Sequence, residues 1–386
     1  MALSILPHLL TTSAKKNGVK NEIVILTATS GDTGKAAMAG FADVPGTRII
    51  VFYPNGGVSP IQEKQMVTQK GDNTYVVAIE GNFDQAQSAV KAIFGDKELA
   101  KEMDEKGFQF SSANSINIGR LIPQVAYYVY AYAKLFAEGK VSKDQKINVV
   151  VPTGNFGNIL AAYYAKNMGL PIDKLICASN ENRVLYDFFT TGEYDKNREF
   201  ILTNSPSMDI LISSNLERFL YDLTGCDDKL VSEWMKELNT NGSYEVSADV
   251  KAKMQEMFTA GCCDDAETMA TIKKCASEYD YVIDTHTAVA KSVYDKYVAQ
   301  TGDTTKTIIA STASPFKFNQ SVLIALEDHN AVVGKDEFTL LKELSEKSNM
   351  QIPKSLYELK DKSVVFDLVC DKDEMQQIVS DFLMVE

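Results

Sequence analysis

Residues 149–158 read Val-Val-Val-Pro-Thr-Gly-Asn-Phe-Gly-Asn, and the interpretation of the whole chain starts from this stretch. A β-branched run stops at a proline, and residues 159–168 carry apolar side chains at helical spacing, which predicts a strand, a glycine-rich turn and a helix. Two glycines let the backbone fold closely around a ligand, and amides at a helix start attract anions, so such a loop binds a phosphate. An ordinary tight turn with a glycine at each bend explains the loop equally well. Other segments of the chain must decide between a phosphate-binding loop and an ordinary turn.

A similar combination of strand, glycine loop and helix occurs earlier in the chain. The apolar run at 23–29 predicts a buried strand, and Ser-Gly-Asp-Thr-Gly-Lys follows at 30–35 before a helix. Ser30 and Thr33 offer hydroxyl groups beside the loop amides, a combination that suits a carboxylate or a ring hydroxyl. The alternative is simple capping of the helix by Asp32 or Thr33.

Strand and helix patterns alternate through the first half of the chain. Ser59 and Gln62 predict a capping box at the start of a helix that runs to Lys70. The alternation predicts a parallel sheet with right-handed crossovers, whose ligands lie beyond the carboxyl ends of the strands. Both glycine loops fall at such ends. Further strands are predicted at 48–53, 74–79, 175–179 and 307–310, and helices at 1–16, 83–94 and 125–136.

Less regular segments complete the pattern. A capped turn at 203–210 is expected to lead into a helix, and residues 227–281 look charged and helical. Residues 330–386 alternate acidic and basic groups and are expected to form a peripheral segment. The helix at 125–136 carries tyrosines that we expect to pack in the core, namely Tyr127, Tyr128, Tyr130 and Tyr132.

Two further polar segments are candidates for a site. Residues 112–120 crowd polar side chains before the aromatic helix, and Arg120 offers a bidentate contact to a carboxylate or phosphate. The alternative for Arg120 is a structural ion pair. The strand at 307–310 ends in Ser-Thr-Ala-Ser-Pro-Phe-Lys-Phe, where a hydroxyl suits a ring nitrogen or, alternatively, a strand-end cap.

Composition limits the possible partners. The 386 residues carry a net charge of −13 and a pI of about 4.9, which opposes binding to nucleic acid or to an anionic membrane. An anionic substrate therefore needs a local positive site. No apolar stretch is long enough to span a bilayer, and the first residues lack the features of a signal peptide, so we expect a cytoplasmic protein. Six cysteines without a C-x-x-C pair and three scattered histidines predict reduced thiols and no metal site.

Five motifs in register resemble threonine synthase across nearly the whole chain. Each motif alone is weak, but five in the same order and at the same spacing are hard to obtain by chance. They are Ala-Thr-Ser-Gly-Asp-Thr-Gly at 28–34, Ser-Pro-Ile-Gln-Glu-Lys at 59–64, Ser-Ala-Asn-Ser-Ile-Asn at 112–117, Gly-Asn-Phe-Gly at 154–157 and Thr-Ala-Ser-Pro-Phe-Lys-Phe at 312–318.

The resemblance implies a fold-type II pyridoxal-phosphate enzyme with two parallel-sheet α/β domains, the architecture of the tryptophan synthase β subunit. The cofactor of this family lies between the two domains. We expect a smaller domain at 1–135, a larger cofactor-phosphate domain at 136–330 and a peripheral segment at 331–386. The family converts O-phospho-L-homoserine and water to L-threonine and phosphate, a carbon–oxygen lyase reaction in which the cofactor acts as electron sink. A monomer or a homodimer is compatible with the sequence.

The resemblance also assigns roles to residues. It implies that the cofactor phosphate is held by Gly154, Asn155, Phe156, Gly157 and Asn158. Thr312 is expected to meet the pyridine nitrogen. The loop at 30–33 would face the cofactor ring through Asp32 and the substrate carboxylate through Ser30, Gly31 and Thr33. Candidates for the substrate phosphate are Ser112, Asn114, Ser115 and Arg120.

The chain also departs from the family pattern. The family's Schiff-base lysine lies in a Phe-Lys-Asp motif ahead of the stretch matched by residues 1–3, so we expect an N-terminally truncated chain that lacks this lysine and is not a competent synthase. We also expect the opening helix to expose Ile5, Leu6 and Leu9. A second departure is Ser-Pro-Phe at 314–316, where the family commonly has His-Pro-Ala. Three lysines near the inferred site are alternatives to the missing Schiff-base lysine, namely Lys35, Lys64 and Lys317.

Three interpretations remain open at this point. The first is a threonine synthase given as a truncated chain, and the segment at 112–117 favours it strongly. The second is another fold-type II enzyme, such as a threonine dehydratase or a cysteine synthase. The third is a non-catalytic remnant that still binds pyridoxal phosphate or phosphate.

Overall fold

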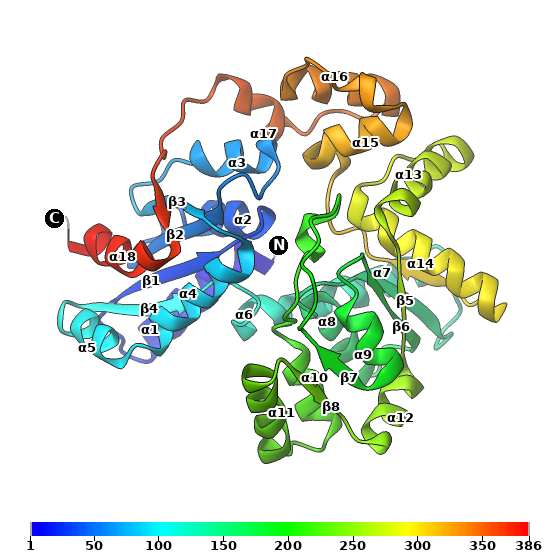
Figure 1. Ribbon diagram of the computed structural model, residues 1–386, viewed down its shortest axis with the longest axis horizontal. Helices are drawn as coiled ribbons and strands as arrows, with labels where there is room; N and C mark the ends of the chain where they lie inside the picture. The colour runs from blue at the N-terminus through cyan, green and yellow to red at the C-terminus, as the bar shows by residue number, and fades with distance from the viewer. Residues whose placement is uncertain (1, 385–386) are drawn as a thin grey trace. The chain divides into compact units, whose positions relative to one another are not determined.

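The computed structural model describes residues 2–384 and divides the chain into two compact units (Figure 1). Unit 1 combines the residues up to Pro123 with those from Pro353 onward, and unit 2 comprises Gln124–Ile352. These boundaries differ from the expected 1–135, 136–330 and 331–386. The aromatic helix α7 (Val125–Ala137) packs against α8 of unit 2, and the C-terminal segment contributes a strand to the sheet of unit 1.

Unit 1 is built on one parallel sheet with the strand order β11-β3-β2-β1-β4. Ile23 and Ile25 of β1 share a buried cluster with side chains of α1 and α2, while α4 contacts β1 and β2. The strands are β1 (Glu22–Ala28), β2 (Thr47–Pro54), β3 (Thr74–Glu80), β4 (Phe108–Ser112) and β11 (Val369–Asp371). The helices are α1 (Ala2–Lys16), α2 (Asp32–Phe41), α3 (Pro60–Val67), α4 (Phe83–Gly95), α5 (Lys97–Glu105), α6 (Ile118–Leu121), α17 (Lys354–Tyr357) and α18 (Met375–Met384).

The start of α3 confirms the predicted capping box. The Gln62 amide donates to Ser59 Oγ at 3.2 Å, and the Ser59 amide donates to Gln62 Oε1 at 3.1 Å. The helix ends at Val67 instead of Lys70, because the Val67 carbonyl accepts hydrogen bonds from the amides of Val365 and Phe366 in the returning C-terminal segment. The C-terminal segment was expected to be peripheral, but it makes these hydrogen bonds and contributes the strand β11 to the sheet of unit 1.

The opening helix α1 is less exposed than expected. Ile5 and Leu9 are 43% and 45% exposed, as predicted, but Leu6 is only 2% exposed. Leu6 and Leu3 belong to the same buried cluster as Met38 and Phe41 of α2. The predicted exposure of Leu6 is therefore wrong, because α2 covers that face of the helix.

Unit 2 contains a second parallel sheet with the order β10-β5-β6-β9 and a small two-stranded antiparallel sheet, β7-β8. One face of the sheet packs Val150 and Ile176 against Val289 and Val293 of α14, and α8 and α9 also contact the sheet. The strands are β5 (Ile147–Pro152), β6 (Ile172–Ser179), β7 (Glu193–Asp195), β8 (Ser243–Glu245), β9 (Phe258–Cys262) and β10 (Thr307–Ile309). The helices after α7 are α8 (Gly157–Asn167), α9 (Val184–Thr191), α10 (Leu216–Leu223), α11 (Asp228–Thr240), α12 (Ala248–Met257), α13 (Asp265–Tyr279), α14 (Thr285–Thr301), α15 (Asn319–Leu326) and α16 (Glu337–Ser348).

Several local expectations in unit 2 are wrong. The segment 227–281 contains β8 and β9 besides helices, because β9 finds a partner in β6. The turn at 203–210 leads only to a short 3₁₀ helix at Pro206–Met208, and the next α-helix begins at Leu216. Of the tyrosine stripe, Tyr128 is buried, whereas Tyr130 is 70% exposed. The strand β10 lies at the sheet edge and is only half-buried.

Asp303 should make the stability of unit 2 depend on pH. Hydrogen bonds from Thr305, Tyr297 and Asn148 hold the pKa of Asp303 well below its usual range. A carboxylate with a lowered pKa stabilises the fold above its unfolded pKa of about 3.9, and this contribution is lost as the pH falls. We expect Asp303→Asn to lower the free energy of unfolding at pH 7 and to differ progressively less from wild type below about pH 4. Urea unfolding between pH 7 and pH 3 measures this, and a difference independent of pH would contradict it.

Candidate functional site

The predicted phosphate loop lies at the carboxyl end of β5 and runs into α8. Phe156 precedes the first helical residue with φ of 61°, a left-handed conformation that is unfavourable for a bulky residue. Its ring is 1% exposed and packs at 5.7–6.0 Å, centroid to centroid, against three rings. These rings belong to Phe189, Phe219 and Phe258. Burial of a phenylalanine side chain contributes roughly 2–3 kcal/mol, which offsets the strain and anchors the loop.

Hydrogen bonds on one side of the loop turn its amides toward the other side. Ser213 Oγ donates to the Gly154 carbonyl at 2.9 Å, and Asn215 Nδ2 donates to the Asn155 carbonyl at 2.8 Å. In a trans peptide the N–H of the next residue points opposite to the carbonyl, so the amides of Asn155 and Phe156 face away from these donors.

The amides of the loop have no acceptor within the part of the chain that the structure describes. No residue among 2–384 accepts a hydrogen bond from the backbone N–H groups of residues 154–158. Unpaired amides at the start of a helix, together with the helix dipole, suit a phosphate dianion. This arrangement favours the anion-binding interpretation over an ordinary tight turn.

Ser213 and Asn215 are residues of the site that were not predicted from the sequence. The available signal was the polar run Ser-Ser-Asn at 213–215 before α10, which resembles a helix cap. Asn215 does precede α10, but its side chain makes no capping bond and reaches the loop instead. Their role depends on contacts about 60 residues away in sequence, which a local pattern does not reveal.

The side chains of the loop hold the backbone in place. Asn158 Nδ2 donates to Gln124 Oε1 at 3.0 Å, and the Tyr128 hydroxyl donates to Asn158 Oδ1. Ser214 Oγ donates to Asn155 Oδ1 at 3.1 Å. Any contact of these two asparagines with a phosphate is therefore expected from their backbone amides.

Thr312 lies three residues after β10, the strand next to β5, at the same end of the sheet as the loop at 154–158. Ile309 of β10 pairs with Val150 of β5, so the segments after both strands start side by side. Thr312 is exposed and makes no hydrogen bond with any residue between 2 and 384. Its hydroxyl is therefore available to a ligand.

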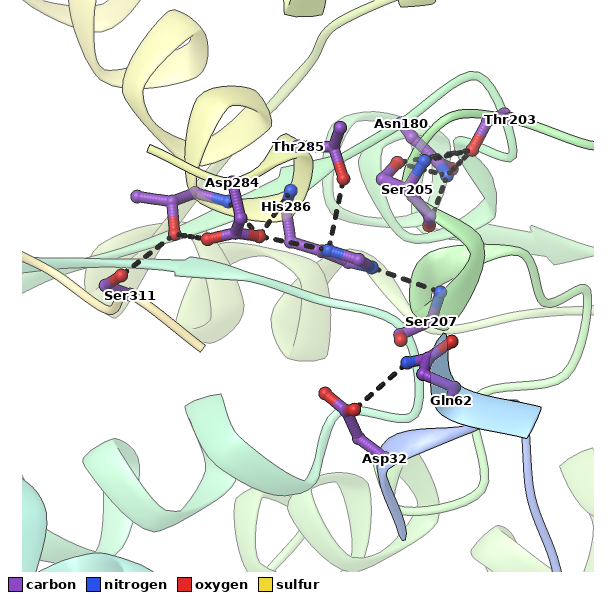
Figure 2. A network of polar contacts seen from close by, with 11 residues as sticks. Asp32, Gln62, Asn180, Thr203, Ser205, Ser207, Asp284, Thr285, His286 and Ser311 are labelled. Atoms are coloured by element: carbon purple, nitrogen blue, oxygen red, sulfur yellow. Dashed lines mark hydrogen bonds and ion pairs between the residues drawn. The ribbon is translucent and has the colours of Figure 1, made fainter. Parts of the chain in front are cut away.

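Ser311, which follows β10, belongs to a polar network that includes the buried side chains of Asp284 and His286 (Figure 2). The Thr287 hydroxyl donates its one proton to the Asp284 carboxylate, so Ser311 Oγ, which lies 3.1 Å from Thr287 Oγ1, is the donor in that contact. His286 Nδ1 lies 3.1 Å from Asp284 Oδ1, and both side chains are almost fully buried. Burial raises the pKa of Asp284, but the hydrogen bonds from His286 and Thr287 outweigh it, so the pKa lies below its usual range.

In unit 1, the 30–33 loop follows β1. The hydroxyl of Thr29 accepts from the amides of Gly31 and Gly34 at 3.0 and 2.8 Å. Gly31 has φ of 126°, and a Cβ there would lie 2.4 Å from the side chain of Gln62. Asp32 Oδ1 accepts from Gln62 Nε2 at 3.0 Å, and Gly31 occupies the N-cap position of α2, so Asp32 and Thr33 lie inside the helix. The simple capping alternative is wrong.

Arg120 joins the two polar segments of unit 1. Its guanidinium donates to the Ala113 carbonyl at 3.0 Å and to Thr33 Oγ1 at 2.9 Å. Ser112 and Asn114 are buried, and Ser115 is half-buried. The site residues predicted after β1 and β4 are therefore brought together, since these two strands are neighbours in the sheet.

Asn114 acts as an extension of the β1–β4 ladder. Its Nδ2 donates to the Ala28 carbonyl at 2.7 Å, and its Oδ1 accepts from the Ala28 amide at 3.2 Å. A side-chain amide thus replaces a peptide group where β4 has ended. This pairing places Asn114 in the scaffold of the site.

The candidate lysines sit on three different elements. Lys35 on α2 donates to Gln69 Oε1 at 3.0 Å, Lys64 lies on α3, and Lys317 lies in the 3₁₀ helix at Pro315–Phe318. Within residues 2–384, no group of three or more metal-ligating side chains is positioned to hold a metal ion. None of the described helices is both long enough and apolar enough to cross a membrane.

Comparisons with known proteins agree with this geometry. The family profile "Pyridoxal-phosphate dependent enzyme" matches residues 2–311, and "Threonine synthase, C-terminal" matches 287–378. The crystal structure of a pyridoxal-phosphate-bound threonine synthase from Brucella melitensis superposes with a TM-score of 0.81 and 34% identity, covering 99% of this chain and 74% of that one. This chain belongs to the threonine synthase family. The fold is the expected fold-type II architecture with two parallel sheets.

Threonine synthase relatives from several organisms show similar identity. Threonine synthase from Saccharomyces cerevisiae is 39% identical over 341 residues, which covers 85% of this chain and 64% of that protein. "Threonine synthase-like 1" from Homo sapiens is 39% identical over 359 residues, covering 91% of this chain. The chain spans 46% of the length of that human relative.

The pairing of Asn114 with Ala28 should contribute measurably to the stability of unit 1. Asn114→Ala leaves a buried N–H and a buried carbonyl without partners, so we expect a loss of about 2–3 kcal/mol. Native-state hydrogen exchange of the β1 amides measures the loss. The control Asn17→Ala removes an exposed side-chain bond and should cost less than about 0.5 kcal/mol. Equal effects of the two substitutions would contradict the assignment.

Proposed function

We propose that this chain carries the cofactor- and substrate-binding residues of a threonine synthase, which converts O-phospho-L-homoserine and water to L-threonine and phosphate. The supporting observation is the row of loop amides at 154–158, which find no acceptor among residues 2–384, in a chain of this family. The sequence motif at 154–157 and the unpaired backbone N–H groups of the loop independently support its assignment as the phosphate-binding loop.

In unit 2, we assign the cofactor phosphate to the amides of Gly154, Asn155, Phe156, Gly157 and Asn158. The N-terminus of α8 adds the partial positive charge that an acidic protein needs to hold a dianion. The Thr312 hydroxyl would donate a hydrogen bond to the pyridine nitrogen. When bound, pyridoxal phosphate supplies an electron sink for proton removal from the substrate.

In unit 1, we assign substrate recognition to the segments after β1 and β4. Ser30, Gly31 and Thr33 would bind the substrate carboxylate, and Asp32 would face the cofactor ring. Ser112, Ser115 and Arg120 would bind the substrate phosphate. Asn114 would hold this segment at the end of β1 through its bonds to Ala28. The guanidinium plane of Arg120 is oriented by Ala113 and Thr33, which prepares it for a bidentate anion contact.

The test is to incubate the complete gene product with pyridoxal phosphate and O-phospho-L-homoserine and to measure both phosphate and threonine. Equimolar threonine and phosphate are expected. Phosphate release without threonine would mean that water is not added after elimination, and it would overturn the synthase assignment. The position of the Schiff-base lysine ahead of residue 1 stays a prediction, so the 386-residue chain is assayed in parallel.

Gly154→Ala should weaken binding of the cofactor phosphate. A Cβ at this position would lie 2.9 Å from the Ser207 carbonyl oxygen and 3.2 Å from Met208 Cα, so the loop backbone must shift. Pyridoxine 5′-phosphate is a suitable probe, since it lacks the aldehyde and cannot react with lysines. We expect its affinity to fall about tenfold, equivalent to one or two lost amide bonds.

The control for Gly154→Ala is Gly95→Ala, a position with no atom within 4 Å of the added Cβ. Fluorescence titration of the wild type and both variants gives the dissociation constants. An unchanged affinity in Gly154→Ala would contradict the assignment of the loop to the phosphate.

In the complete gene product with its Schiff-base lysine, Arg120→Ala should impair the use of O-phospho-L-homoserine. Loss of a charged hydrogen-bond partner of an anion is expected to lower kcat/KM by the equivalent of about 2 to 4 kcal/mol. Arg183→Ala is the matched control, because Arg183 is an exposed member of a surface ion pair. Unchanged kcat/KM in a stably folded Arg120→Ala variant would return Arg120 to a purely structural role.

A further inference from the structure

Residues 205–209 of unit 2 lie against the loop at 154–158, and we call this segment the wall. The Ser207 carbonyl oxygen and Met208 Cα lie so close to Gly154 that a single added methyl group would meet both. Two backbones in such contact cannot move independently. The position of Ser207 and Met208 therefore helps to set the position of the loop.

Asp209 fixes one end of this wall. Its carboxylate is 4% exposed and accepts from Asn180 Nδ2 at 2.7 Å, from Asn182 Nδ2 at 2.9 Å and from the Thr203 amide at 2.9 Å. Burial raises the pKa of Asp209 above its usual range despite these bonds. Asn180 follows the carboxyl end of β6, so this end of the wall is tied to the sheet.

His286 holds the middle of the wall. The Ser207 amide donates to His286 Nε2 at 3.2 Å (Figure 2). A backbone amide is only a donor, so Nε2 must carry the lone pair and the ring proton belongs on Nδ1, which donates to Asp284 Oδ1. The ring is 2% exposed and packs on Phe318 with centroids 4.8 Å apart. His286 is thus locked in one tautomer and one orientation.

We propose that His286 is a positioning residue for the cofactor phosphate. Through the Ser207 amide it holds the wall in contact with Gly154, and Asp284 at the start of α14 holds the imidazole tautomer that can accept this bond. The proposal rests on the assignment of the 154–158 loop to the cofactor phosphate. His286 takes no part in the hydrogen bonds that Ser213 and Asn215 make to the loop, so its proposed effect on ligand binding is indirect.

Substitutions can separate the hydrogen bond from the packing of the ring. Glutamine in His286→Gln places an amide oxygen near the position of Nε2, where it can accept from Ser207. Asparagine in His286→Asn ends near the position of Nδ1, so it keeps a polar contact to Asp284 but leaves the Ser207 amide without an acceptor. Methionine in His286→Met keeps the volume and also lacks the acceptor. The two loss variants disturb the core differently, so either one suffices for the test.

Two measurements are made on each variant. Hydrogen exchange of the ligand-free protein reports on the amides of Ser205 and residues 207–209, and fluorescence titration gives the affinity for pyridoxine 5′-phosphate. In the loss variants we expect exchange of these amides to accelerate about tenfold and affinity to fall about five- to tenfold, the effect of one lost hydrogen bond. His286→Gln should stay within about twofold of wild type in both measurements.

The outcomes distinguish this proposal from the assignment beneath it. Equal weakening in His286→Gln and the loss variants would show a packing effect and overturn the proposal. Faster exchange at 205–209 with unchanged affinity would overturn it as well, since the wall would then not set the phosphate site. If wild type fails to bind pyridoxine 5′-phosphate more tightly than pyridoxine, the phosphate assignment of the loop is wrong, while the exchange data still show whether His286 holds the wall.

Discussion

The site of unit 2 depends on one constraint: the backbone between β5 and α8 must present its amides to a ligand while its carbonyls are satisfied elsewhere. Ser213 and Asn215 supply donors for the carbonyls of Gly154 and Asn155. The planar peptide then turns the following N–H groups to the opposite side. On the proposed assignment, a protein with net charge −13 gains a local anion site without placing a lysine or arginine in the loop.

The surrounding structure maintains that arrangement through buried contacts. The ring of Phe156 anchors the loop in an aromatic cluster contributed by α9, α10 and β9. On another side, the backbone of Ser207 and Met208 abuts Gly154, and Asp209 and His286 hold these residues. Preorganised donors of this kind need no rearrangement when an anion binds, which is how a rigid scaffold gains affinity.

Much of the fold follows from local sequence patterns. The β-branched run at 149–151 and the capping box at Ser59 predicted elements that the structure confirms, because buried parallel strands and helix starts have strong local signatures. The strands β9 and β11 were missed, since Phe-Thr-Ala-Gly-Cys and Val-Cys-Asp have no alternating pattern and become strands only by pairing with β6 and β3. The motifs identified the loops of the site, but Ser213, Asn215 and His286 act over long sequence separations that no local pattern encodes.

The most direct test of the central claim observes the loop amides themselves. In an amide-resolved NMR titration of the 386-residue chain, pyridoxine 5′-phosphate should shift the N–H protons of Asn155, Phe156, Gly157 and Asn158 downfield, as expected for new hydrogen bonds to a charged acceptor. Pyridoxine without the phosphate should leave these signals in place. Unchanged loop signals at a saturating concentration of pyridoxine 5′-phosphate, with shifts elsewhere in the spectrum, would contradict the account.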